Sequence, residues 1–252
     1  MIPLSPTNDL VEKYYIVQNL KKVTTTKRLE LKKAYNIREL PIIEGKLLRS
    51  DLNFRRAYNS RQVNSLYFDN SKFSAIEDSL SGTSQRKKTR LRWYGKLRES
   101  NHPTLEVKFK KGQTSWKELY STSLRLDPLE DTWTDAFTSK YSEPYNYNIR
   151  DILLEGYTRP VSLVSYNRKY FESVDGCIRV TIDQKLTYRD QTLLRKPNFD
   201  KKRTAPQIII LEFKLARENQ HLLQNIVHKL DFTPERFSKY CESTYYRRIK
   251  WR

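Results

Sequence analysis

The chain has 252 residues, enough for one large domain with a substantial buried core. Its 48 Lys and Arg against 29 Asp and Glu give a formal net charge of +19, which attracts polyanions such as nucleic acid, an anionic membrane or a phosphate polymer. Seventeen Tyr and an aromatic content of 12% argue against disorder, and two cysteines without a Cys/His cluster exclude a disulfide framework and a zinc site.

Segments in which polar and apolar residues alternate predict eight strands, because successive side chains of a strand point to opposite faces of a sheet. The predicted strands cover residues 28–37, 63–69, 84–95, 104–111, 115–124, 161–173, 178–186 and 209–214. Short helices are predicted over residues 72–80 and 131–140, and a C-terminal helical pair over residues 219–230 and 234–246. Residues 40–60 and 189–207 are predicted to be long loops. The fold class is therefore α+β with mostly antiparallel strands.

Four of the predicted strands carry charged or polar side chains on one face and mostly apolar side chains on the other. Trp93, for example, falls with Leu91 on the apolar face of its strand. The four charged faces hold Arg86, Lys88, Arg90 and Arg92; Glu106, Lys108 and Lys110; Arg179, Thr181, Asp183 and Lys185; and Glu212 and Lys214.

On a half-exposed sheet the charged face meets water, and that explanation suffices for any one of these strands. The set favours another arrangement, because eight strands can close into a barrel that holds one small ligand, with helices packed outside. Charged faces then point inward, and buried cations without a counter-charge cost several kcal/mol each. The pattern thus predicts an eight-stranded antiparallel β-barrel tunnel for a triphosphate or polyphosphate chain with a divalent metal, because Arg and Lys both bind phosphate.

Eight segments, in order along the chain, resemble the VTC domain, a polyphosphate polymerase domain of the triphosphate tunnel metalloenzyme (CYTH-like) superfamily. The segments are RLELKKAY (28–35), SLYFDN (65–70), RKKTRLRWYG (86–95), LEVKFKKG (105–112), YNRKYFE (166–172), RVTID (179–183), ILEFKLA (210–216) and RFSKYCES (236–243). The resemblance implies a single tunnel domain over residues 1–252. It also implies ATP-dependent transfer of the γ-phosphoryl group to a growing polyphosphate chain inside the tunnel, with Mn²⁺ or Mg²⁺ as cofactor.

The resemblance also implies roles for individual side chains. It places Lys32, Arg90, Arg92 and Lys239 in catalysis, Lys88, Lys108, Lys110, Lys117, Arg168 and Arg179 in binding substrate phosphates, and Glu212 at the metal. One departure from the ExExK strand of many tunnel enzymes is that Arg28 replaces the first Glu, leaving Glu30 and Lys32. This disfavours a two-metal hydrolytic mechanism and favours one metal held mainly by Glu212 and phosphate oxygens. Glu106 is expected to pair with a neighbouring cation instead.

Two alternatives stay open: a metal-dependent triphosphatase or NTPase of the same fold, and a non-catalytic module that binds polyphosphate or RNA. Nucleic acid is the less favoured partner, because aromatic residues within strands more often belong to the core or rim than to a base-stacking platform. The sequence starts with no basic segment followed by an apolar stretch, and no run of about 18 apolar residues occurs. A cytoplasmic protein without a transmembrane segment is expected, so recruitment to a membrane would need a partner.

Overall fold

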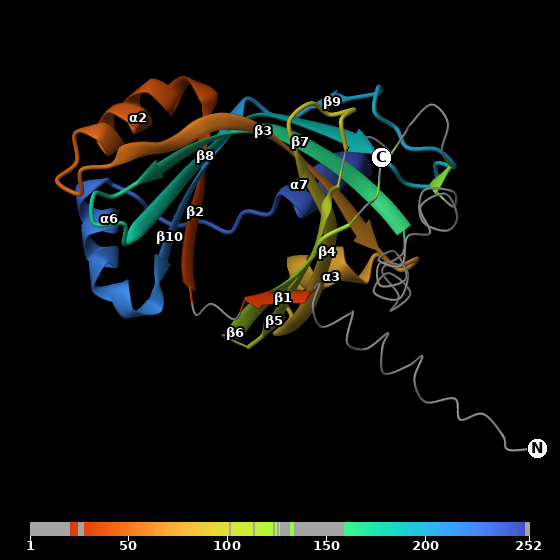
Figure 1. Ribbon diagram of the computed structural model, residues 1–252, viewed down its shortest axis with the longest axis horizontal. Helices are drawn as coiled ribbons and strands as arrows, with labels where there is room; N and C mark the ends of the chain where they lie inside the picture. The colour runs from red at the N-terminus through yellow and green to blue at the C-terminus, as the bar shows by residue number, and fades with distance from the viewer. Residues whose placement is uncertain are drawn as a thin grey trace, which may run out of the picture.

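Figure 1 shows a computed structural model, which describes residues 21–24, 28–100, 102–112, 114–122, 124, 126, 132–133 and 159–249. The strands are β1 (Lys21–Thr24), β2 (Arg28–Asn36), β3 (Arg55–Asp69), β4 (Gln85–Tyr94), β5 (Thr104–Lys111), β6 (Thr114–Tyr120), β7 (Arg159–Glu172), β8 (Ile178–Asp190), β9 (Arg203–Thr204) and β10 (Ile208–Ala216). The helices are η1 (Ile37–Glu39), α2 (Leu40–Leu48), α3 (Ser74–Ser81), η2 (Arg217–Leu222), α6 (Leu223–Lys229) and α7 (Lys239–Ile249).

All ten strands belong to one antiparallel sheet, in the order β1-β6-β5-β4-β3-β7-β8-β10-β2, with β9 paired to β8. The predicted α+β class and the eight predicted strands are confirmed, and β1 and β9 are added to them. The predicted helices over residues 72–80 and 219–230 correspond to α3 and to η2 with α6. The helix predicted over residues 131–140 lies almost wholly outside the described residues.

The predicted loop over residues 40–60 is wrong, because it contains α2 and the first part of β3. Pro41 stands in the first turn of α2, where its missing N–H costs no hydrogen bond. The first part of β3 is mostly exposed and pairs with β7, so its side chains show no apolar alternation. The last helix begins at Lys239 rather than at residue 234, because the preceding segment lies along the free edge of β2, where the Glu235 N–H donates to the Lys32 carbonyl (2.6 Å).

The sheet curves strongly, but no strand pairing closes it within the described residues, so it is a barrel only in a loose sense (Figure 1). Its two edges are β1 and β2, and no ladder joins these strands within the described residues. Thr24 and Arg28 are nevertheless only four positions apart, so their Cα atoms lie within about 14 Å of each other. Glu30 of β2 and Lys108 of β5, from distant strands of the sheet, form an ion pair (3.1 Å). The face that carries these two side chains is therefore concave.

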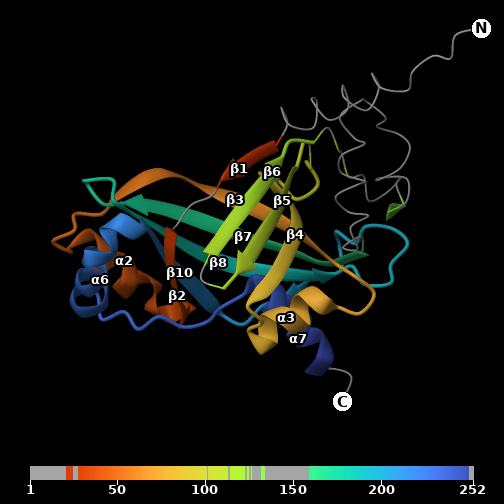
Figure 2. The same cartoon turned by 90° about the horizontal axis from the view of Figure 1, so that it is seen from below.

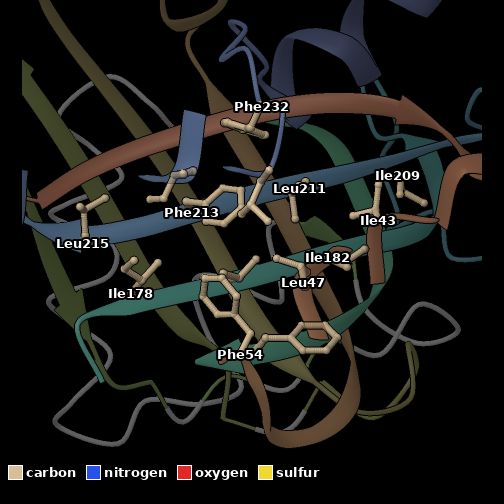
Figure 3. Close-up of a cluster of buried hydrophobic side chains, with 14 residues drawn as sticks. Ile43, Leu47, Phe54, Ile178, Ile182, Ile209, Leu211, Phe213, Leu215 and Phe232 are labelled. Atoms are coloured by element: carbon tan, nitrogen blue, oxygen red, sulfur yellow. The ribbon is translucent and has the colours of Figure 1, made fainter. Parts of the chain in front are cut away.

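The opposite, outer face is apolar and carries two hydrophobic clusters. In the first, Ile43 and Leu47 of α2 pack against β8 and β10, whose outward residues include Ile182, Leu211 and Phe213 (Figure 3). The second cluster covers the outer face of β3, β4 and β5, and it includes Trp93, as the alternation predicted. Burial of these apolar rows stabilises the fold by about 25 cal/mol for each Å² of apolar surface removed from water. Because successive side chains of a strand point to opposite faces, the charged rows then lie on the concave face.

Not all helices pack outside. Helices α3 and α7 lie next to each other at one end of the sheet (Figure 2), and their side chains join a third cluster with concave-face residues of β3, β7 and β8. Tyr240 of α7 stacks on Tyr67 of β3 (5.1 Å between ring centroids) and donates a hydrogen bond to the buried Asp69 (2.5 Å). These contacts hold the start of α7 against the concave face. Within the described part of the chain, every helix is too short or too polar to span a bilayer.

Candidate functional site

The first group of charges on the concave face centres on Glu106 of β5. Strand register places Arg90 of β4 opposite Glu106, and Arg90 donates two hydrogen bonds to its Oε2 (3.0 and 2.6 Å). Arg92 lies 3.2 Å from the other carboxylate oxygen. Burial opposes ionisation of Glu106, but the two guanidinium groups outweigh it and lower its pKa to about 2. Glu106 thus acts as the fixed counter-ion of two arginines, the pairing expected from the sequence.

The second group centres on Asp183 of β8, whose side chain is fully buried. Arg168, its partner in the β7–β8 register, donates bidentate hydrogen bonds to both carboxylate oxygens (2.6 and 2.8 Å). Lys239 at the start of α7 lies 2.5 Å from the same carboxylate and also over the ring of Tyr166. Despite burial, Lys239 and Arg168 lower the pKa of Asp183. Arg168 also lies 3.9 Å from Glu212, which connects this group to the third.

The third group is a chain of alternating charges across β10, β2 and β5. Glu212 accepts from Lys32 (3.1 Å), its register partner, and lies 3.5 Å from Lys214. Lys32 also contacts Glu30 (3.3 Å), which in turn contacts Lys108 (3.1 Å). Burial opposes ionisation of Glu30, but Lys32 and Lys108 lower its pKa to about 2, and the pKa of Glu212 is also lowered against burial by Lys32 and Lys214. Lys32 is thereby shared between two carboxylates.

Three lysines of this face have lowered pKa values, and burial is the largest cause for each of Lys88, Lys117 and Lys214. Lys88 donates to Ser238 Oγ (3.1 Å), a neutral partner beside Lys239. Lys117 lies at the register position beside Lys108, and Arg90 and Arg92 also disfavour its charge. A lysine whose protonated form is disfavoured in this way gains from an added anion.

Together these side chains form a cationic cluster with too few counter-ions. Nine Lys and Arg meet four Asp and Glu, so the surplus is 9 − 4 = +5. Its members, called the concave-face cluster below, are Lys32, Lys88, Arg90, Arg92, Lys108, Lys117, Arg168, Lys214 and Lys239, with Glu30, Glu106, Asp183 and Glu212.

Two of the residues predicted from the sequence lie apart from this cluster. Lys110 lies one same-face step beyond Lys108 on β5, beside Arg86 in the register. The side chain of Arg179 is 64% exposed and pairs with Glu172 (3.3 Å), so it lies at the rim of the sheet. The other predicted residues are brought together.

Sequence reasoning did not place Asp183 or Lys214 in the site, although both fall on the charged faces that the alternation identified. Tyr166, which lies under Arg168 and Lys239, was missed as well. Its only sequence signal is its position two residues before Arg168, on the same face of β7. Its pKa is lowered against burial, chiefly by Arg168 and Arg92.

A divalent metal fits this site only in company with phosphate. Among the described residues, no three Asp, Glu, His or Cys side chains converge into a metal cage. Glu30 and Glu212 both contact the ammonium group of Lys32, so they flank one position that already holds a positive charge. Mg²⁺ is commonly held by one or two carboxylates, water and substrate phosphate oxygens, so this donor set meets its needs.

The chain matches the family described as VTC domain over residues 9–246. No curated protein shows significant sequence similarity to it.

Several solved structures match most of this chain at low sequence identity. A Vibrio parahaemolyticus protein described as a candidate adenylate cyclase has 12% identity and a TM-score of 0.46, and the match covers 86% of this chain and 97% of that one. A Pyrococcus horikoshii protein has 14% identity and a TM-score of 0.45, with 87% and 99% covered. A Hippeastrum protein described as a candidate adenylyl cyclase with a dominant triphosphatase activity has 12% identity and a TM-score of 0.43, with 86% and 95% covered. All three TM-scores are below 0.5, so the assignment of the chain rests on the family match.

Proposed function

Because this chain belongs to the VTC domain family, we propose that it is an ATP-dependent polyphosphate polymerase. It would transfer the γ-phosphoryl group of ATP to a growing polyphosphate chain along the concave face. The observation that carries this proposal is the surplus of five positive charges in the concave-face cluster, on a face where α3 and α7 cover one end. A partly buried surplus of this size attracts a polyanion, and polyphosphate supplies one negative charge or more per unit.

The proposed roles follow from the geometry. Arg90 and Arg92 present planar forks suited to bidentate phosphate binding, and Arg168 does so from the facing group. Lys239 enters from α7 and Lys32 from β2, so the transferring group would be approached by cations from several sides. Phosphoryl transfer needs little covalent help from a protein, and fixed positive charge around the equatorial oxygens is the main contribution.

Glu212, with Glu30 beside it, would hold the divalent metal. When bound, the metal would neutralise negative charge on the phosphate groups. Lys32 contacts both carboxylates, and it would turn to a phosphate if Glu30 and Glu212 held the metal.

The number of carboxylates at the metal position supports a phosphate acceptor rather than water. Arg28 stands where many tunnel enzymes have the first Glu of the ExExK strand, so Glu30 and Glu212 are left to hold a metal. Two carboxylates suit one metal ion better than the two ions of a hydrolytic mechanism. The terminal phosphate of a polyphosphate chain is already an anionic nucleophile and needs no general base. These features favour the polymerase over the triphosphatase.

The test is to incubate the purified protein with ATP and Mg²⁺ or Mn²⁺ and to separate polyphosphate from nucleotides on a gel. We expect long chains with the wild type, none with Glu212→Gln, and normal chains with the matched control Glu99→Gln, which changes an exposed carboxylate paired with Lys96. Release of orthophosphate alone would instead identify a triphosphatase. Binding of polyphosphate without any turnover would identify a binding module.

A further inference from the structure

Three tyrosines surround one arginine where β3, β4 and β7 meet. The guanidinium carbon of Arg61 lies 5.6, 5.8 and 5.5 Å from the ring centroids of Tyr58, Tyr94 and Tyr170. Tyr58 and Tyr170 also meet edge to face, with centroids 5.8 Å apart. Tyr58 is 62% and Tyr94 50% exposed, so much of this aromatic surface faces solvent. These four residues are called the tyrosine platform below.

The strands connect the tyrosine platform directly to the phosphate-binding arginines. Tyr94 follows Arg92 by two residues on β4, and Tyr170 follows Arg168 by two residues on β7, so each tyrosine shares the face of its arginine. Both strands pair antiparallel with β3 and therefore run in the same direction. Each two-residue step thus leads toward the same end of the concave face, over about 7 Å. On β3 between them, Arg61 is the register partner of Arg168.

This arrangement matches the shape of a nucleotide. A nucleoside triphosphate joins a flat aromatic base to a chain of phosphates, and the protein presents exposed rings one step beyond its phosphate-binding guanidinium groups. Nucleobases stack on Tyr rings and on Arg guanidinium planes, and this stacking tolerates any base because every base has a π-face. The exposed rings are also at the end of the concave face that α3 and α7 leave uncovered.

We propose that Tyr58, Tyr94, Tyr170 and Arg61 form the subsite that binds the base of the nucleoside triphosphate whose phosphates contact the concave-face cluster. This inference rests on the proposed function and adds the source of nucleotide recognition. Because the tyrosine platform reads the face of the base and not its edge, it favours ATP over inorganic triphosphate but discriminates little between ATP and GTP.

The experiment measures binding by calorimetry at fixed salt, with two probes: the β,γ-imido analogue of ATP, which is not turned over, and inorganic triphosphate, which lacks a base. The variants are Tyr58→Leu/Tyr94→Leu, which removes two exposed rings, and Tyr58→Phe/Tyr94→Phe, which keeps the rings and removes only the hydroxyl groups. Both positions are at least half exposed, so neither pair of changes disturbs the core.

We expect the Leu pair to weaken binding of the ATP analogue about tenfold and to leave inorganic triphosphate within twofold of wild type. The Phe pair should bind both probes as the wild type does. The inference is overturned if the Leu pair binds the analogue normally, or if both probes weaken by the same factor. A wild-type protein that binds neither probe refutes the proposed function itself, which separates the two failures.

Discussion

Replacing Asp183 by Asn tests whether the concave-face cluster is held together by its counter-ions. Asp183 is fully buried and is shared by Arg168 and Lys239, whose side chains are only 11% and 12% exposed. Asn keeps the shape and removes the charge, so two buried cations lose the anion that they share. Removing one partner of a buried ion pair costs about 3–5 kcal/mol of unfolding free energy, because the charge that remains is uncompensated.

The melting temperature should report this loss. For a chain of this length each kcal/mol corresponds to about 2–4 °C, so Asp183→Asn should melt about 6–20 °C below wild type. If polyphosphate binds the concave-face cluster as proposed, it supplies a new anion for Arg168 and Lys239 in the folded state. Saturating polyphosphate should therefore raise the melting temperature of the variant more than that of the wild type. Thermal unfolding followed by fluorescence, with and without polyphosphate, measures both effects.

Asp200→Asn is the matched control, because Asp200 is exposed and pairs with Arg98 at the surface. An exposed pair contributes up to about 1 kcal/mol, so the control should melt within about 4 °C of wild type. The reasoning is refuted if Asp183→Asn melts like Asp200→Asn. It is equally refuted if polyphosphate raises the melting temperatures of Asp183→Asn and wild type by the same amount.

Three further predictions follow. Burial lowers the pKa values of Lys88 and Lys214, and a bound polyanion would raise them. Polyphosphate binding should therefore take up protons and weaken as pH rises, and calorimetry in buffers of different ionisation enthalpy measures the proton uptake. The pKa of Glu106 is about 2 in the folded state, below its usual 4.5, so its stabilisation is present above pH 4.5 and disappears as pH falls toward 2, which urea unfolding across this range would detect. Tyr240→Phe removes a hydrogen bond to Asp69 and should cost about 1.5–3 kcal/mol in urea unfolding and raise the KM for ATP.

The alternation of side chains predicted the sheet well where both faces of a strand carry a clear signal. The strand over residues 104–111 was predicted with its observed bounds, and the pairing of Glu106 with a cation was predicted with it. The first part of β3 could not be predicted in this way, because its exposed residues have no apolar partners on the other face. Strand β1 could not be predicted either, because it has only four residues and its backbone pairs with β6, a strand about a hundred positions further along the chain.

The candidate site could be predicted only as a set of charged rows, not as a set of contacts. The ion pair between Lys239 and Asp183 depends on how α7 docks, and Tyr240 and Asp69 determine that by a tertiary contact with no local sequence signal. The tyrosine platform was missed for a related reason. Tyr58 falls in a segment predicted to be a loop, so nothing placed it beside Tyr170.

The carboxylates of the concave-face cluster bear on how a polymerase could release and move its product. If the cations had no counter-ions, they would bind a polyphosphate chain more strongly, and each advance of the chain would have to break stronger contacts. Glu106, Asp183 and Glu212 each contact at least two cations, so an entering phosphate must compete with a carboxylate for the same guanidinium or ammonium group. When the chain advances by one unit, each cation exchanges one oxygen ligand for another of similar strength. The cluster would thus bind polyphosphate strongly as a whole while opposing its movement only weakly, which is what processive growth of a chain requires.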